Sequence, residues 1–195
     1  MTSQKLASQE TKVTLPLSDE QSQWLKDIIR DVPDFPKPGI MFKDLTPLMK
    51  DSKAFSFVLE CLAAQCRQYK PTVIVGIEAR GFILAPAVAH LLGVGFVPVR
   101  KPGKLPWQTE KVSYALEYGE DSIEVHKDAV TQADRVVIID DLLATGGTAL
   151  AAKQLMQKLH AQVVACGFVV ELDFLSGKSK VVGSDKLDLF SIIHF

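Results

Sequence analysis

Residues Val136 to Thr148 read VVIIDDLLATGGT. The uninterrupted run of valine and isoleucine predicts a strand that is covered on both of its faces. Asp140 and Asp141 follow at the end of this strand, and a loop of small residues then leads into a helical pattern. Two adjacent carboxylates at the end of a strand are poorly placed for packing. The segment therefore predicts a ligand site where strand, loop and helix meet.

The loop has the properties of a sugar-phosphate site. Glycines let the backbone approach a ligand closely, and the free amides that open a helix favour an anion. Carboxylates accept hydrogen bonds from ribose hydroxyls, so we predict that Asp140 and Asp141 bind ribose. The 5′-phosphate would be bound by five consecutive residues, namely Ala144, Thr145, Gly146, Gly147 and Thr148. An ordinary turn beside a solvated acid pair is the alternative, which the coincidence of strand, acids, loop and helix disfavours.

Other phosphate motifs do not fit the chain. A G-x-x-x-x-G-K-[ST] sequence does not occur, and Gly93-Val94-Gly95 lacks a third glycine and precedes a strand pattern. The Walker and dinucleotide-binding interpretations therefore fail.

Strand and helix patterns alternate along the chain. Apolar runs predict strands at 72–77, 95–99, 135–141, 163–172 and 188–195. Helical periodicity predicts helices at 19–30, 52–69, 81–92 and 147–160. This alternation predicts an α/β fold with a central, mostly parallel sheet flanked by helices, in which ligands bind beyond the carboxyl ends of the strands.

Two segments depart from the alternation. Residues 33–47 hold four prolines and predict an ordered loop, because proline cannot continue a helix. Residues 112–125 predict a two-stranded excursion in which SYALEY and SIEVH are joined by Gly119-Glu120-Asp121.

Length and composition favour one domain. The chain has 195 residues, and 22 basic residues nearly balance 23 acidic ones, so we expect neither nucleic acid nor a membrane as a partner. The polar start of the chain predicts a flexible tail at 1–17, before a single domain at 18–195. Neither a signal core nor a membrane-spanning run is present, and a cytoplasmic location is expected.

The cysteines and histidines do not predict a metal site. The three cysteines, Cys61, Cys66 and Cys166, lack C-x-x-C spacing and are expected to be buried thiols. The four histidines are dispersed along the chain and are expected to be structural or exposed.

VVIIDDLLATGGT resembles the phosphoribosyl diphosphate motif of type I phosphoribosyltransferases at essentially every position. The similarity covers roughly residues 20–195, and its details resemble the adenine-specific members: PDFPKPGIMFKDLTPLM, GIEARGF, VPVRKPGKLP and YALEYG. The resemblance implies purine salvage, in which 5-phospho-α-D-ribose 1-diphosphate and adenine give AMP and pyrophosphate. Two alternatives stay open: transfer to another purine base, and a non-enzymatic regulator that senses the sugar diphosphate.

The resemblance also implies residue roles around the diphosphate. Ala79 and Arg80 would bind pyrophosphate, and Arg80 would also be catalytic, because its fork suits phosphate oxygens. The Glu78–Ala79 peptide would be cis. Family members pair as homodimers, so Lys101 or Lys104 would bind pyrophosphate in the neighbouring subunit. Mg²⁺ would be held mainly by the substrate's oxygens.

Two further segments would cover the substrates. A flexible lid at about residues 101–121 would exclude water, with Tyr114 and Tyr118 as lid residues and Glu117 as the catalytic acid near purine N7. A solvent-facing glutamate is the alternative for Glu117. An N-terminal hood at 33–47 would bind adenine, with Phe42 stacked on the base. The predicted adenine-binding residues are Met41, Phe42 and Lys43, although many relatives carry arginine at the position of Lys43 and a branched aliphatic residue at that of Met41.

Overall fold

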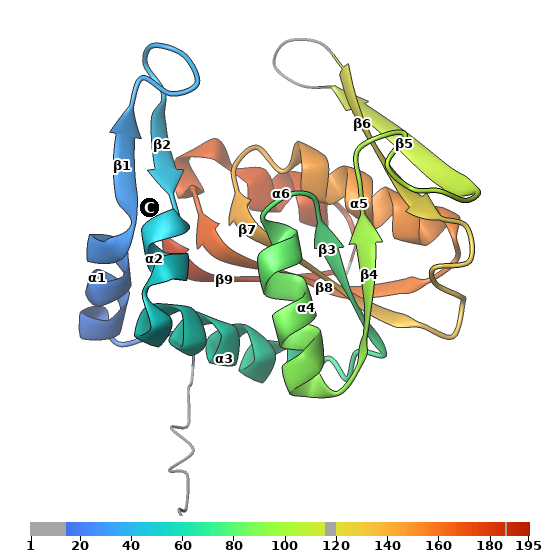
Figure 1. Cartoon of the computed structure of the whole chain (residues 1–195), viewed down its shortest axis with the longest axis horizontal. Helices are drawn as coiled ribbons and strands as arrows, with labels where there is room; N and C mark the ends of the chain where they lie inside the picture. Colours follow the sequence, from blue (N-terminus) through green and yellow to red (C-terminus); the bar gives the residue numbers. More distant parts are fainter. Residues whose placement is uncertain (1–14, 116–119, 186) are drawn as a thin grey trace, which may run out of the picture.

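The structure, a computed structural model, describes residues 15–115, 120–185 and 187–195. Its centre is a sheet of five parallel strands in the order β4-β3-β7-β8-β9 (Figure 1). The strands are β3 (Val73–Ile77), β4 (Gly95–Val99), β7 (Arg135–Leu143), β8 (Gln162–Glu171) and β9 (Asp188–His194). All five were predicted, and their parallel pairing confirms the α/β fold.

Strand β7 contains a continuous apolar run because both of its faces are buried. Val137 and Ile139 pack into one hydrophobic core, whereas Val136 and Ile138 pack into the other, on the opposite face of the sheet. All four side chains are fully buried. Both faces of the central strand are therefore covered, as its composition indicated.

Helices cover both faces of the sheet (Figure 1). The first core is formed with α1 (Asp19–Ile28), α2 (Thr46–Lys50), α3 (Ser52–Gln68) and α4 (Gly81–Leu92). The second core is formed with α5 (Gly147–Lys158), α6 (Gly177–Val182) and the inner residues of the excursion. The short helices α2, α6 and the 3-10 turn η1 (Asp173–Leu175) were not predicted, because such short segments show no helical period.

The segment predicted as a loop at 33–47 is largely a hairpin. Strand β1 (Arg30–Pro33) pairs antiparallel with β2 (Met41–Asp44), and helix α1 ends at Ile28, before the predicted residue 30. The loop prediction was right for residues 34–40, which connect the two strands, and wrong for Met41–Asp44, which form β2. Pro33 is compatible with the end of an edge strand. Pro47 lies in the first turn of α2, where a missing amide hydrogen costs little. We call the β1–β2 hairpin the hood.

The excursion is a longer ladder than predicted. Strand β5 (Thr109–Ala115) pairs antiparallel with β6 (Glu120–His126). Glu120 and Asp121 belong to β6 and not to a turn, so the predicted lid boundary at 121 falls inside a strand. The ladder begins at Thr109, three residues before the predicted start, and Val112, Ile123 and Val125 anchor its base in the second core. We call the β5–β6 ladder the lid.

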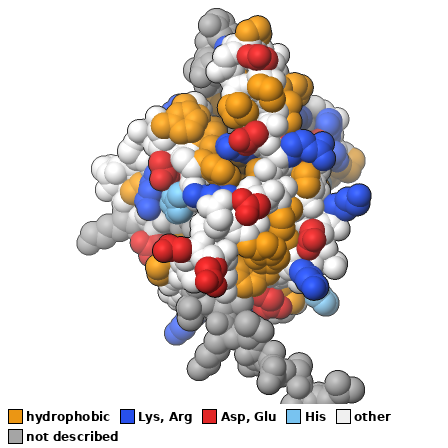
Figure 2. Space-filling view, turned by 90° about the vertical axis from the view of Figure 1, so that its left-hand side faces the viewer, with side chains coloured by type: hydrophobic (Ala, Val, Ile, Leu, Met, Phe, Trp, Pro, Cys, Tyr) orange, Lys and Arg blue, Asp and Glu red, His pale blue; other side chains and the backbone are white. Residues whose placement is uncertain are grey.

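The hood and the lid rise on either side of the carboxyl end of β7 (Figure 1). Figure 2 shows the face that carries the hood, where acidic and basic side chains are mixed and hydrophobic side chains gather towards the top. Among the described residues, none of the helices has the length and hydrophobicity that crossing a membrane requires.

Candidate active site

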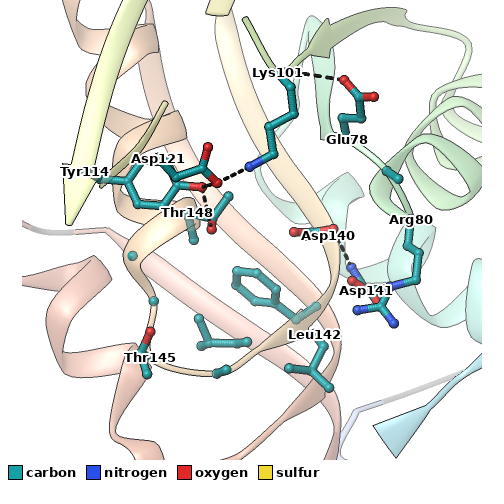
Figure 3. A pocket seen from close by; sticks show the side chains of 17 residues that line it. Glu78, Arg80, Lys101, Tyr114, Asp121, Asp140, Asp141, Leu142, Thr145 and Thr148 are labelled. Atoms are coloured by element: carbon teal, nitrogen blue, oxygen red, sulfur yellow. Dashed lines mark hydrogen bonds and ion pairs between the residues drawn. The ribbon is translucent and has the colours of Figure 1, made fainter. Parts of the chain in front are cut away.

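A cavity of about 300 Å³ lies at the carboxyl ends of β3 and β7. Its walls come from residues 78–80 after β3 and from residues 140–149, which include the end of β7 and the start of α5. Lys101, Tyr114, Asp121 and Phe168 complete the lining (Figure 3). The cavity thus brings together the residues predicted for ribose, for the 5′-phosphate and for part of the pyrophosphate site.

The two acids lie side by side at the end of β7. Asp140 Oδ1 accepts a hydrogen bond of 2.9 Å from the amide of Asp141, whose side chain is buried. Arg80 Nε lies 2.7 Å from Asp141 Oδ2. This oxygen forms that ion pair but accepts no well-oriented hydrogen bond from any described residue. A buried acceptor of this kind fits a hydroxyl donor or a cation.

The protonation of the acid pair is perturbed by its surroundings. Loss of water raises the pKa of Asp140 well above its usual value, and repulsion by Asp141 raises it further. Burial also raises the pKa of Asp141, while the guanidinium of Arg80 opposes this change. Such shifts are common where charged groups are placed for binding or catalysis.

The loop before α5 is suited to an anion. Gly146 caps this helix with a φ of +76°, and no side chain caps the helix start, so its amides are available. A Cβ atom on Gly146 would lie 2.6 Å from the carbonyl oxygen of Gly177. Helix α6 therefore packs directly against the loop and requires glycine there. Thr148 Oγ1 donates a hydrogen bond of 3.1 Å to the hydroxyl of Tyr114.

A buried lysine holds α6 in place behind the loop. Lys153 Nζ donates a hydrogen bond of 2.8 Å to the carbonyl oxygen of Val181 and lies 2.6 Å from Asp185 Oδ2. Neither Lys153 nor Gly177 was predicted as part of the site. Gly177 begins α6, which lies far from the loop in sequence and is too short for a periodic signal. Lys153 lies in α5 and contacts α6 only through the fold.

On the opposite side of the cavity, the Glu78–Ala79 peptide is cis, which confirms the prediction. Glu78 accepts hydrogen bonds from Lys104 Nζ at 2.6 Å, from the amide of Lys101 at 3.0 Å and from Arg100 Nε at 3.3 Å. Burial alone would raise the pKa of Glu78, but these hydrogen bonds outweigh it and bring the pKa to about 2. Glu78, which we had not predicted as a site residue, thus connects the basic segment to the loop of Arg80.

Lys101 is bound to a residue that the sequence interpretation had placed in a turn. Its Nζ donates to Asp121 Oδ2, and the hydroxyl of Tyr114 lies 3.1 Å from the same oxygen. Tyr114 and Asp121 are directly opposite each other in the ladder, so their side chains share one face. Only the strand register reveals this contact. Glu117 and Tyr118 lie outside the described residues.

Both lysines predicted to bind pyrophosphate are paired within their own chain. Lys101 lines the cavity, whereas Lys104 does not, and the side chain of Lys104 is half exposed. A contact of either lysine with a neighbouring subunit stays a prediction.

The hood residues lie beside the cavity and do not line it. Phe42 is close to the pyrophosphate side, because the guanidinium carbon of Arg80 lies 5.3 Å from its ring centre. Met41 is half exposed. Lys43 Nζ pairs with Asp31 of the neighbouring strand at 2.6 Å. The structure therefore brings Phe42 to Arg80 but does not bring Met41 or Lys43 into the lining of the cavity.

The remaining candidate residues lie elsewhere. All three cysteines are free and buried, and burial raises the pKa of each thiol to about 12. His194 Nδ1 lies 2.9 Å from Asp173 Oδ1 and 3.9 Å from Glu171 Oε2. Spacing along the chain had not predicted this cluster, because the pairing of β8 with β9 creates it.

Comparison with known proteins agrees with this geometry. A model of the phosphoribosyl transferase domain matches residues 49–193. The chain therefore belongs to the phosphoribosyltransferase family. Its similarity is to adenine phosphoribosyltransferases: that of Solibacter usitatus is 53% identical over 171 residues, which cover 88% of this chain and 97% of the relative.

Solved structures show the same relationship. The crystal structure of adenine phosphoribosyltransferase from Thermoanaerobacter pseudethanolicus is 51% identical with a TM-score of 0.84, and covers 89% of this chain and 99% of its own. The enzyme from Saccharomyces cerevisiae, complexed with D-2,5-dideoxy-2,5-imino-altritol 1,6-bisphosphate and adenine, is 39% identical with a TM-score of 0.81. It covers 89% of this chain and 99% of its own.

Proposed function

We propose that the cavity binds 5-phospho-α-D-ribose 1-diphosphate and transfers its phosphoribosyl group to adenine, giving AMP and pyrophosphate. One observation carries the proposal. A buried carboxylate oxygen of Asp141, which is paired with Arg80 but accepts no well-oriented hydrogen bond from the described residues, lies in the same cavity as an uncapped, glycine-containing helix start. Hydroxyl donors would complete the hydrogen bonding of this oxygen, and a phosphate would bind the free amides of the helix start. The yeast relative was crystallised with a bisphosphate and adenine, which supports a phosphorylated sugar and a purine base as the ligands.

The sugar phosphate would be held from two sides. Asp140 and Asp141 would accept hydrogen bonds from the ribose hydroxyls, and the arrival of these donors would compensate for the desolvation of the acid pair. The backbone amides of 144–148 would bind the 5′-phosphate at the positive end of α5, with the hydroxyls of Thr145 and Thr148 as further donors. Fixing both ends of the ribose orients its C1 atom towards the base.

The diphosphate would lie on the side of Ala79, Arg80 and Lys101. A guanidinium binds phosphate oxygens bidentately, so Arg80 would release Asp141 and bind the diphosphate. It would then stabilise the negative charge of the departing pyrophosphate. The oxygen-rich lining fits Mg²⁺, which would be held mainly by diphosphate and ribose oxygens, with the two aspartates nearby. When bound, Mg²⁺ neutralises part of the charge on the leaving pyrophosphate.

Adenine would bind between the cavity and the hood. Phe42, already next to Arg80, would stack on the purine, and backbone groups near Met41 would bind its edge. Lys43 would contribute from the same strand. The bond between adenine N9 and ribose C1 forms while the bond from C1 to the diphosphate breaks, and no covalent enzyme intermediate is required. Adenine loses its one imidazole proton in this step, and the proton would leave through N7 to Glu117. Glu117 would hold a proton near N7, and the lid, with Tyr114 and Tyr118, would exclude water.

The same family resemblance supports a cytoplasmic homodimer in which Lys101 or Lys104 reaches the neighbouring subunit. Of the two, Lys104 is favoured, because Lys101 lines the cavity of its own chain and Lys104 does not. The proposal includes a tail at 1–17 and a single domain at 18–195, although Leu15 and Leu17 of the predicted tail pack against the first hydrophobic core.

The reaction is tested by mixing the protein with the sugar diphosphate and Mg²⁺ and adding adenine, hypoxanthine, guanine or xanthine in turn. We expect nucleotide from adenine. Nucleotide only from an oxopurine would assign a different base, and binding of the diphosphate without any product would indicate a sensor.

The ribose assignment is tested by the double variant Asp140→Asn, Asp141→Asn. It removes both charges while keeping the side-chain shapes, so we expect kcat/KM to fall about 1,000-fold or more with an unchanged circular dichroism spectrum. Asp128→Asn, in an exposed turn, is the matched control and should retain activity. Near-normal turnover by the double variant would refute the assignment.

A further inference from the structure

Asp121 places a negative charge in a cavity proposed for a polyanion. Four acidic side chains, Glu78, Asp121, Asp140 and Asp141, line this cavity, whereas the basic side chains among its described lining residues are Arg80 and Lys101. Asp140 and Asp141 have ribose as a proposed partner, and Glu78 anchors the basic segment. Asp121 alone among these acids has no part in the proposed reaction.

The contacts of Asp121 involve groups that the substrate needs. Its Oδ2 atom binds Lys101 Nζ and lies 3.1 Å from the hydroxyl of Tyr114. That hydroxyl in turn accepts the hydrogen bond of Thr148 Oγ1 at 3.1 Å. Figure 3 shows these four side chains meeting at one wall of the cavity. Lid, basic segment and phosphate loop are thus connected through one carboxylate.

The geometry points to Asp121 as an internal competitor of the sugar diphosphate, a residue that sets the affinity for this substrate. Its carboxylate binds Lys101 as an anionic ligand would. It also accepts a hydrogen bond from the hydroxyl of Tyr114, and this hydroxyl in turn accepts the hydrogen bond of Thr148. The sugar diphosphate must displace these contacts before its diphosphate group binds Lys101 and its 5′-phosphate binds Thr148. The inference rests on the proposed function and deepens it.

Asp121 could compete with the substrate for Lys101, or it could only orient Lys101 for binding. The charge of Asp121 distinguishes these two roles. The side chain of Asp121 remains 28% exposed, so its charge is not hidden from an incoming anion. Lys101 bound to Asp121 has its charge largely compensated, and so attracts an anion less than a free lysine does. A neutral side chain at position 121 would therefore strengthen the binding of anions.

The test is the variant Asp121→Asn, which removes the charge and keeps one oxygen acceptor. At low ionic strength we expect the KM for the sugar diphosphate to fall about three- to tenfold, since a partly exposed charge pair is being released. The KM for adenine, which is uncharged, should change less than twofold. The gain should shrink as salt rises, because salt screens charges at this separation.

A binding measurement complements the kinetics. Calorimetric titration with inorganic pyrophosphate and Mg²⁺ should show tighter binding to Asp121→Asn than to the unmodified protein. Asp128→Asn removes the same charge from an exposed turn after β6 and should leave both quantities unchanged. Asp121→Ser removes the charge with a smaller side chain and gives the same test if the asparagine variant does not fold.

The outcomes separate the two proposals. If the unmodified protein forms no AMP, the proposed function fails. If it forms AMP but Asp121→Asn has an unchanged or raised KM for the sugar diphosphate, Asp121 is not a competitor. An equal fall in the KM for adenine would also overturn the inference, because a general structural change would then explain the effect.

Discussion

At the scale of single residues, the site is formed by groups whose free energy is unfavourable in the absence of ligand. The adjacent carboxylates of Asp140 and Asp141 lose water and repel each other, and Arg80 compensates only the second of them directly. Leaving such charges close together destabilises the folded state, and binding sites commonly show this trade-off. The acid pair should therefore limit the stability of the protein.

Asp140→Asn should stabilise the fold. The folded protein raises the pKa of Asp140 above the usual 3.8, so ionisation opposes folding as the pH rises above about 4. At pH 7 we expect the free energy of unfolding to increase by about 1 kcal/mol or more, with the Arg80–Asp141 ion pair intact. Below pH 3.5 the gain should disappear, because both states are then protonated.

Urea unfolding at pH 3 and at pH 7 measures this difference. Asp128→Asn should change the free energy of unfolding by less than about 0.5 kcal/mol at either pH, as is usual for an exposed residue. A stabilisation of Asp140→Asn that did not depend on pH would show that the charge is not its cause.

The sequence identified the residues of the β7–α5 segment because their function is local. Asp140 and Asp141 follow the strand directly, and the glycine loop follows them. The functional groups and the elements that position them are therefore adjacent in sequence. Glu78 and Asp121 were not identified, because their contacts with Lys101 join residues 20 or more positions apart. Charge alone does not distinguish an acid that organises a site from a solvated one.

At the scale of elements, the phosphate loop depends on α6. Its backbone passes so close to the loop that a Cβ atom on Gly177 would overlap the carbonyl oxygen of Ala144. Lys153 fixes this helix from within the second core. The shape of the anion site is thus set jointly by its own glycines and by a neighbour in space.

Gly177→Ala should displace the loop. The added methyl meets backbone atoms, which cannot move aside as a flexible side chain can, so we expect a loss of about 1–3 kcal/mol in stability. Because the amides of the loop would move with it, kcat/KM for the sugar diphosphate should fall about tenfold or more. Steady-state kinetics and thermal unfolding measure the two effects.

Gly95→Ala is the matched control. Its Cβ atom would lie 3.7 Å from Val73 Cγ2, an ordinary van der Waals contact, so both activity and stability should change little. Unchanged kinetics in Gly177→Ala would mean that α6 does not shape the anion site.

At the scale of the whole molecule, the five-stranded sheet followed from the sequence, whereas the hood and the exact lid did not. Strands buried on both faces are continuous apolar runs, which any window of sequence detects. The hood is an exposed hairpin of proline-containing segments, and its pairing of Arg30 with Asp44 is visible only in three dimensions. Elements at the edge of the fold show weak hydrophobic periodicity, because many types of side chain are compatible with a solvent-exposed position.

Lys104 connects the cavity to the quaternary structure that we propose. Its side chain does not line the cavity of its own chain, yet it is half exposed and close to the basic wall through Glu78. In a homodimer, an exposed lysine of this kind is free to exchange its own-chain partner for the diphosphate of the neighbouring site. If Lys104 acts across the interface, a subunit that lacks it can therefore be complemented by a partner subunit that carries it.

Subunit mixing distinguishes the two arrangements. We expect Lys104→Met alone to raise the KM for the sugar diphosphate about tenfold, through loss of one charged contact. We then form mixed dimers of Lys104→Met with the Asp140→Asn, Asp141→Asn variant. In each mixed dimer, one site combines the intact acids of the Lys104→Met subunit with the intact Lys104 of the other subunit. At a sugar diphosphate concentration far below KM, unfolding and refolding the two variants together should restore roughly a quarter of unmodified activity, since half of the dimers are mixed. Activity that stayed at the average of the two separate variants would place Lys104 in the site of its own chain.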